Sequence, residues 1–268
     1  MLELIETGIQ TGPRRVMLYG EHGIGKSTWA ANAWKPIFIQ TEDGLGQIDC
    51  TRFPLATSYE DVMAALTALY EEDHDFQTIV VDTLDWLQQL IFKKVCDDRQ
   101  VTTIEDIGYA KGYTFAMQHW REVLKALDVV RRKRSMMVIL LAHCHIEKVE
   151  PPDGPQYDRY SPKLDHRANG PVQEWCDEIL FAGYAVMTKA TDGGFNRKIV
   201  KAIEGERVVY VKPHPARVSK WRLQGTVPSA LSMDFNDYGA YVMGKAPAAA
   251  IIPEIPSDNG QEQEEQTE

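Results

Sequence analysis

Cysteine is scarce in this chain, and long apolar runs are absent from it. The four cysteines, Cys50, Cys96, Cys144 and Cys176, stand far apart and form no C-x-x-C pair, so we expect reduced thiols in a cytoplasmic protein. No stretch approaches the roughly 20 apolar residues that span a bilayer, so we expect no membrane partner. Residues 1–6 lack a basic region followed by an apolar core, and no signal peptide is predicted.

Basic residues are missing from the end of the chain. After Lys245 there are six acids and no base, and taking these six from the net charge of −10 leaves −4 for the rest. This balance argues against a protein that coats nucleic acid by bulk charge, but it leaves room for binding through a local basic loop. Residues 246–268 contain no aromatic residue and are expected to form an acidic disordered tail.

The remaining composition is that of an ordinary globular protein, with 44% hydrophobic and 25% charged residues. We expect residues 1–245 to form one α/β domain, because short apolar runs alternate with helical patterns, which is typical of a mainly parallel sheet. Strands are predicted at 16–19, 37–39, 78–81, 136–141 and 179–186, and helices at 27–34, 58–72, 83–91 and 115–132. A capping box is predicted at Thr57 and Glu60, and a C-terminal hairpin is predicted to turn at Glu204-Gly205.

The segment GEHGIGKST fits the phosphate-binding P-loop motif G-x-x-x-x-G-K-[ST]. Its glycines let backbone N–H groups turn toward phosphate oxygens, Lys26 supplies a mobile charge for the β- and γ-phosphates, and Ser27 offers a hydroxyl to Mg²⁺. A predicted strand precedes the loop and a predicted helix follows it, as the motif requires; the alternative is a Gly-rich surface turn. ATP and Mg²⁺ are the expected ligands. The expected nucleotide-binding residues are Gly20, Glu21, His22, Gly23, Ile24, Gly25, Lys26, Ser27 and Thr28.

An acid ends the predicted strand at 78–81. Asp82 in this place has the form of a Walker B acid, which holds the Mg²⁺ shell at the C-terminal end of a strand, where ligands bind in such sheets. The alternative is that Asp82 is an N-terminal residue of the helix that follows.

A second acid site follows the strand predicted at 37–39. A carboxylate there is expected beside the γ-phosphate, where it accepts a proton from an attacking water or orients it. Glu42 is the candidate and Asp43 is its rival. A solvated turn at Asp43-Gly44 is the alternative.

The strand at 136–141 leads into Ala142-His143-Cys144-His145. His143 stands nearest the strand end and is the candidate that senses the γ-phosphate. Zinc binding by His143, Cys144 and His145 is not expected, because adjacent strand residues point to opposite faces.

A long loop is predicted at 147–170, and it mixes basic with aromatic residues. Such a mixture suits a single-stranded DNA backbone with stacked bases, whereas an ordinary mobile loop is the alternative. The residues are Lys148, Tyr157, Arg159, Tyr160, Lys163, His166 and Arg167.

Lys220 and Arg222 flank Trp221 on an extended segment and so point the same way. Such a pair could reach the phosphates of a nucleotide held by a neighbouring subunit, as an arginine finger does. A plain surface pair is the alternative.

Together these residues resemble the RecA-like recombinase-core P-loop ATPases, and among them the small phage-encoded proteins regarded as single-strand annealing or recombinase proteins. The resemblance covers most of residues 12–243. It rests on GEHGIGKST, FIQTEDG, IVVDTLDWL, GYAKGYTFAMQHW, ILLAHCHIEKVEPP, VQEWCDEILFA, taken as a strand, and VSKWRLQGTVPSALSMDF.

The resemblance implies a RecA-like core that binds the nucleotide between subunits, assembles into a filament or ring, and binds DNA with two inner loops. By position, Lys26 and Ser27 match the P-loop, Asp82 the Walker B acid and Glu42 the catalytic acid. His143 falls where relatives carry a polar sensor, often Gln. Lys220 and Arg222 match the K-x-R pair of RadA-type relatives. No separate DNA-binding domain is present, so annealing or a helper role is expected rather than autonomous strand exchange.

Three functions follow from these residues. The first is a DNA-stimulated ATPase in homologous recombination or strand annealing, acting on single-stranded DNA, with a single-strand DNA-binding protein as a further partner. The second is a P-loop ATPase that acts with replication or packaging proteins and needs no DNA. The third, a small-molecule kinase, would need an arginine-rich lid and an acceptor pocket, neither of which the sequence indicates. The acidic tail is expected to cover the basic loop or to recruit a partner.

Overall fold

The computed structural model describes residues 5, 7–8, 12–192 and 198–245. Within these residues, nine strands form a sheet of order β3-β2-β4-β5-β1-β7-β8-β9, with β6 paired to β5 off this path. The strands are β1 (Arg15–Gly20), β2 (Pro36–Gln40), β3 (Thr51–Arg52), β4 (Thr78–Asp82), β5 (Met137–Val149), β6 (Tyr157–Pro162), β7 (Glu178–Asp192), β8 (Lys198–Tyr210) and β9 (Ala230–Ser232).

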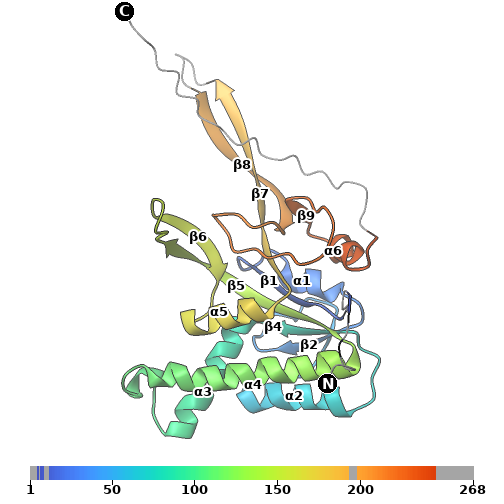
Figure 1. The fold of residues 1–268 in the computed structure, drawn as a ribbon, viewed down its shortest axis with the longest axis vertical. Coiled ribbons are helices and arrows are strands. Elements are labelled where there is room, and N and C mark those ends of the chain that lie inside the picture. Colours follow the sequence, from blue (N-terminus) through green and yellow to red (C-terminus); the bar gives the residue numbers. More distant parts are fainter. Residues whose placement is uncertain (1–4, 6, 9–11, 193–197, 246–268) are drawn as a thin grey trace, which may run out of the picture.

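The strands from β3 to β7 in this order pair in parallel, whereas β6, β8 and β9 are antiparallel to their neighbours. The predicted α/β fold with a mainly parallel central sheet is therefore confirmed. The hairpin of β7 and β8 extends as a long ribbon away from the sheet (Figure 1).

Helices cover both faces of the sheet (Figure 1). They are α1 (Lys26–Ala31), α2 (Tyr59–Glu71), α3 (Leu84–Arg99), α4 (Lys111–Arg134), α5 (His166–Trp175) and α6 (Phe235–Val242), with a short 3₁₀ helix, η2 (Ile104–Asp106). In β1, Met17 and Tyr19 belong to the core shared with α2 to α5, whereas Val16 and Leu18 belong to the core shared with α1 and α6. Successive strand residues point to opposite faces, so an almost wholly apolar strand fills two cores at once.

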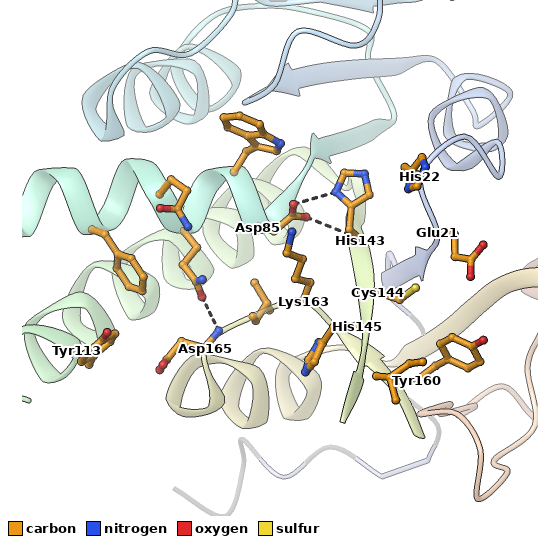
Figure 2. A pocket seen from close by; sticks show the side chains of 16 residues that line it. Glu21, His22, Asp85, Tyr113, His143, Cys144, His145, Tyr160, Lys163 and Asp165 are labelled. Atoms are coloured by element: carbon orange, nitrogen blue, oxygen red, sulfur yellow. Dashed lines mark hydrogen bonds and ion pairs between the residues drawn. The ribbon is translucent and has the colours of Figure 1, made fainter. Parts of the chain in front are cut away.

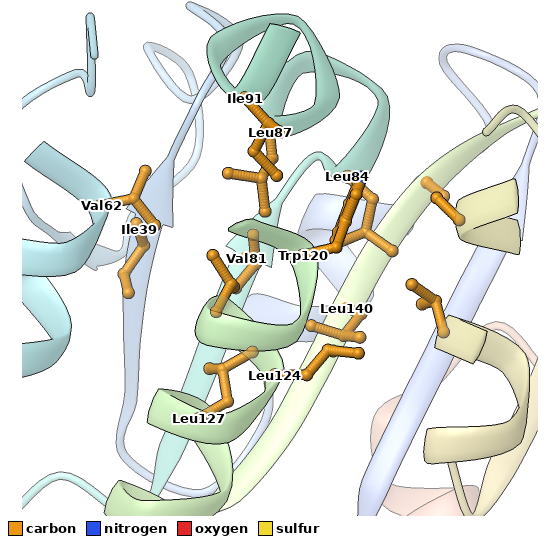
Figure 3. Close-up of a cluster of buried hydrophobic side chains, with 14 of the residues drawn as sticks. Ile39, Val62, Val81, Leu84, Leu87, Ile91, Trp120, Leu124, Leu127 and Leu140 are labelled. Atoms are coloured by element: carbon orange, nitrogen blue, oxygen red, sulfur yellow. The ribbon is translucent and has the colours of Figure 1, made fainter. Parts of the chain in front are cut away.

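The larger core lies between the sheet and α2, α3 and α4 (Figure 3). On α4, the buried residues Trp120, Leu124 and Leu127 recur at intervals of three and four, which places them on one face of the helix. They pack against Val81 of β4 and Leu140 of β5. This packing fixes the strands whose C-terminal ends carry the predicted site.

The beginning of α2 differs from the predicted capping box at Thr57 and Glu60. The N-cap is Ser58, whose hydroxyl accepts a hydrogen bond from the backbone N–H of Asp61 at 3.1 Å, while the Asp61 carboxylate accepts from the Ser58 N–H at 3.0 Å. The pairing of a hydroxyl with an acid three residues later is the same, shifted by one position along the chain.

The predicted loop at 147–170 is wrong. β5 continues to Val149 and pairs with β6, and α5 follows from His166. The segment 150–156 contains Pro-Asp-Gly, a turn signal that joins two strands, so the backbone groups on either side pair with each other rather than with water. The sequence VQEWCDEILFA likewise splits, because its first four residues end α5 and its strand begins at Glu178.

The predicted turn at Glu204-Gly205 is also wrong, because both residues lie inside β8, whose hairpin partner is β7. A side chain at Gly205 would place its Cβ 2.0 Å from the carbonyl oxygen of Ala185. The glycine therefore permits a close approach of two strands. The predicted tail at 246–268 lies outside the described residues.

All four cysteines are free, as expected. In the part of the chain that the structure describes, none of the helices combines the length and the apolar character that a bilayer crossing requires.

Candidate nucleotide-binding site

The phosphate-binding loop joins β1 to α1. Gly23 and Gly25 have φ values of 74° and 108°, a backbone region that favours glycine. The buried Lys26 Nζ donates hydrogen bonds to the carbonyl oxygens of Gly20 at 3.1 Å and Glu21 at 2.9 Å. Burial lowers the pKa of Lys26, although nearby acids oppose this shift. The Lys26 amine is thus bound by carbonyl groups of its own loop, and an anion could take the place of these two carbonyl partners.

Ser27 and Asp82 meet beside this loop. The Ser27 hydroxyl donates to Asp82 Oδ2 at 2.6 Å, and Asp82 is 2% exposed. Burial raises the pKa of Asp82 against the effect of that hydrogen bond. Its other oxygen, Oδ1, is buried and has no hydrogen-bond partner in the described chain. An unpartnered carboxylate oxygen next to a hydroxyl suits a hard cation, so these two residues fit Mg²⁺.

Glu42 is held close to Asp82 by the end of β2. Thr41 donates its backbone N–H to the Asp82 carbonyl and its hydroxyl to the Thr83 carbonyl, both at 2.7 Å. These bonds fix the chain just before Glu42, which is partly buried, whereas its rival Asp43 is exposed. Burial raises the pKa of Glu42, and the neighbouring His143 acts in the opposite direction.

His143 lies opposite Gly20 in the pairing of β5 with β1 and is fixed by Asp85 of α3. The His143 backbone N–H donates to Asp85 Oδ1 at 3.0 Å, and Nδ1 lies 2.8 Å from Oδ2 (Figure 2). Burial acts to raise the pKa of Asp85, but the hydrogen bonds from His143 outweigh it and lower the pKa. The carboxylate is then an acceptor only, so Nδ1 donates and Nε2 is left for other partners.

Three side chains converge as a result. Ligand atoms of Glu42, Asp85 and His143 lie within 4.8 Å of one another. Asp85 was not singled out by the sequence reasoning; its signal was an acid three residues after Asp82, in the first turn of the next helix. Cys144 and His145 are not part of this group.

Comparisons with known proteins show the family to which the chain belongs. A family model described as an AAA domain matches residues 12–223. The chain belongs to this family. It is 28% identical over 172 residues to the SPbeta prophage-derived uncharacterized protein YorG of Bacillus subtilis (strain 168). That match covers 62% of this chain and 49% of YorG, so the chain spans about half the length of this curated relative.

Among solved structures, the crystal structure of the RadB recombinase is similar to this AAA domain with a TM-score of 0.39 and 13% identity, covering 74% of this chain and 88% of that one. The family supports a P-loop ATPase in general.

A cavity of about 990 Å³ opens next to the P-loop of the AAA domain, between α3, β5 and β6 (Figure 2). Glu21 and His22 of the loop line one side, and His143 lines it as well. Trp86 of α3, half exposed, and the exposed Lys163 line other parts. The cavity therefore joins the predicted sensor residue to an aromatic ring and a cation at the surface.

The basic and aromatic residues of segment 147–170 separate into two groups. Arg159 forms an ion pair with Glu147 across the β5–β6 hairpin, Tyr160 stacks on Phe181 with ring centroids 4.9 Å apart, and Arg167 lies over the ring of Tyr113. Lys148, Lys163 and His166 are exposed. The second group is the part of the segment that is open to a ligand.

Lys220 and Arg222 lie at the opposite end of the sheet from the P-loop, since Lys220 bridges to Ile179 at the start of β7. The Lys220 Nζ donates to three carbonyl oxygens at the end of α5, at 2.6, 2.9 and 3.2 Å. Arg222 lies 3.6 Å from a carboxylate oxygen of Asp177. Within one chain the pair stabilises the end of α5, and its role toward a neighbouring subunit stays a prediction.

Proposed function

We propose that this AAA domain binds ATP and hydrolyses it, and that single-stranded DNA stimulates the reaction. The observation that carries the proposal is the convergence of Lys26, the Ser27–Asp82 pair and Glu42 at one edge of the sheet. A phosphate cradle alone would support binding. A partly buried carboxylate beside it supplies an acceptor for the proton of an attacking water.

Each residue has a distinct task in this proposal. Lys26 exchanges its two carbonyl partners for the β- and γ-phosphate oxygens. Ser27 and Asp82 would hold Mg²⁺, which neutralises developing charge on the phosphates when bound. Glu42 orients the water and takes its proton. His143, with its ring fixed by Asp85, presents Nε2 toward the same region and links it to the cavity.

Single-stranded DNA is the proposed trigger at that cavity, in recombination or strand annealing. The half-exposed Trp86 offers a surface for base stacking and Lys163 offers a charge for a phosphate. The prophage origin in the name of YorG supports a phage setting. Assembly into a filament or ring, with Lys220 and Arg222 near a neighbour's nucleotide, and cooperation with a single-strand DNA-binding protein belong to the same proposal.

The test is ATP turnover with and without a single-stranded oligonucleotide. We expect the oligonucleotide to raise turnover of the wild-type chain, Lys26→Ala to remove turnover under both conditions, and Trp86→Ala to keep the basal rate but lose the stimulation. Lys93→Ala, an exposed lysine of α3, is the matched control and should behave like the wild type. A wild-type chain that hydrolyses no ATP under either condition would contradict the proposal.

One observation favours a second candidate, a P-loop ATPase that acts with replication or packaging proteins. The β5–β6 hairpin carries Arg159 already paired with Glu147, and its exposed residues include Glu150, Asp153 and Asp158 beside Lys148. Mixed charge of this kind suits a protein surface better than a phosphate backbone. Turnover that is indifferent to any nucleic acid but rises with a replication protein would select this candidate.

A further inference from the structure

The γ end of the proposed nucleotide site lies on one side of β1. Asp82 and Glu42 come from β4 and from the end of β2, which follow β5 on that side of the sheet. A triphosphate whose γ-phosphate lies near them runs across the loop, so its α-phosphate and nucleoside leave on the other side, toward β7 and β8. This inference rests on the proposed function and concerns the residues that would contact the α-phosphate and the nucleoside.

A pocket lies there, bordered by Gly23 of the phosphate loop and by residues of β8 and β9. It is separate from the cavity that contains His143. Tyr184 and Arg207 line it, and they are directly opposite each other in the pairing of β7 with β8. Residues opposite each other on paired strands share a face of the sheet, so the ring and the guanidinium stand side by side next to the loop.

A bulge in the ribbon accompanies this placement. The register of β7 against β8 shifts between Tyr184 and Val186, where Gly205 allows the close approach to Ala185. Bulges re-aim side chains and are common next to functional sites. Tyr184 is 40% exposed. It is therefore available for stacking.

Arg207 reaches the phosphate loop from the same pocket. Its Nη1 donates to the Ile24 carbonyl oxygen at 3.4 Å and lies 3.1 Å from the place where a Cβ of Gly25 would stand. Within the described residues, no carboxylate comes within ion-pair distance of it. Asp234, an acid of the same pocket, accepts from the Asn236 backbone N–H at 2.9 Å as the cap of α6. Among the described residues Arg207 thus has no acidic partner, and it is held over the proposed phosphate-binding loop.

We propose that Tyr184 and Arg207 form the subsite for the nucleoside end of the nucleotide. The Tyr184 ring stacks on the base, and the Arg207 guanidinium binds the α-phosphate. The ligand class is a nucleoside di- or triphosphate, and the chain supplies this cation to its own nucleotide. The subsite differs from the Lys220–Arg222 pair, which would have to act on a neighbouring subunit.

The test compares calorimetric affinities for ATP, ADP and inorganic tripolyphosphate. Tyr184→Ala should weaken ATP and ADP binding about tenfold and leave tripolyphosphate binding unchanged, because only the nucleotides carry a base. Arg207→Ala should weaken binding of all three about tenfold, since each has a phosphate at that position.

Matched controls are Tyr70→Ala, a 43% exposed tyrosine of α2, and Arg132→Ala, a mostly exposed arginine of α4. If Lys26→Ala abolishes ATP binding while the Tyr184 and Arg207 variants bind like the wild type, the subsite is refuted and the proposed function survives. A fall in kcat with unchanged affinity in Arg207→Ala would also overturn it, by moving this cation to the γ end. A wild-type chain that binds no nucleotide removes both proposals.

Discussion

The N-terminal and C-terminal ends of the parallel strands form two edges of the central sheet, and charged groups are paired differently at the two edges. At the N-terminal edge, the buried Glu178 accepts from Arg14 and, at 3.2 Å, from the Tyr238 hydroxyl, while Arg15 pairs with Asp177 at 2.8 Å. At the C-terminal edge, the phosphate-loop edge, a buried carboxylate oxygen has no partner in the described chain and a buried lysine rests on loop carbonyls.

The pKa values follow the same division. Burial acts to raise the pKa of Asp177, but hydrogen bonds from Arg15 outweigh it and lower the pKa. Burial raises the pKa of Glu178 as well, yet both oxygens of this carboxylate have partners. At the phosphate-loop edge, burial raises the pKa of Asp82 and of Glu42. One carboxylate oxygen of Asp82 has no hydrogen-bond partner in the described chain. Paired charge marks the edge that holds the fold, and partly unpaired charge marks the edge that carries the proposed nucleotide site.

The largest expected effect concerns Glu42 at the phosphate-loop edge. Glu42→Gln should lower kcat about a thousandfold, because it removes the proposed proton acceptor, and should leave ATP affinity and the melting temperature near their wild-type values. Burial raises the pKa of Glu42, so the wild-type carboxylate takes up its proton at a higher pH than an exposed glutamate. Turnover should therefore fall as the pH drops through that raised pKa, and steady-state kinetics of the Gln variant should lack this acid limb.

The matched control is Asp43→Asn, one residue further along the chain and exposed. It should retain wild-type turnover at all pH values. If the Asn variant is inactive and Glu42→Gln is active, the two carboxylates exchange roles and the predicted candidate is wrong.

The second effect concerns stability and the opposite edge. Glu178→Gln should lower the free energy of unfolding by about 3 kcal/mol, because it leaves Arg14 partly buried without a charged partner. Urea unfolding measures this loss, and ATP turnover per folded molecule should not change. Glu147→Gln makes the same substitution in the more exposed pair with Arg159 and should lower it by less than about 1 kcal/mol. Equal losses of unfolding free energy in the two variants would show that the buried ion pair at the N-terminal edge matters no more to stability than a more exposed pair elsewhere.

The sequence predicted the phosphate-loop edge better than the rest, for a physical reason. The P-loop is a local motif, and parallel strands end at a common edge, so strand-end reasoning brought Lys26, Asp82 and Glu42 together before their distances were known. Their catalytic roles stay predictions. Asp85 escaped notice because its partner His143 lies on β5, more than fifty residues later. Only the pairing of β4 with β5, in which Asp82 stands opposite Leu141, brings the start of α3 beside His143.

Away from the phosphate loop, several contacts between segments could not be foreseen from the sequence. The loop prediction at 147–170 overlooked that a Pro-Asp-Gly turn permits two strands to pair. Nothing near Lys220 in the chain reveals that its amine meets the end of α5, more than forty residues earlier. Arg207 was missed for the same reason, because the ribbon carries it back to the loop.

The smallest expected effect tests whether Lys220 belongs to the paired edge. Lys220→Met keeps the aliphatic stem but removes three hydrogen bonds from a charged donor to carbonyl oxygens at the end of α5. We expect a loss of about 2 kcal/mol in the free energy of unfolding, measured by urea denaturation, with kcat unchanged. Lys133→Met, an exposed lysine in the last turn of α4, is the control and should change neither quantity.

If Lys220 acts on the nucleotide of a neighbouring subunit, as an arginine finger does, the opposite result is expected. A cation that completes a neighbour's nucleotide site contributes about a thousandfold or more to kcat and little to the stability of its own chain. If Lys220→Met keeps its stability and loses turnover, Lys220 acts across a subunit boundary and the N-terminal edge is functional after all. A variant that loses stability and keeps its turnover leaves Lys220 as a cation that holds the end of α5 through its three carbonyl partners.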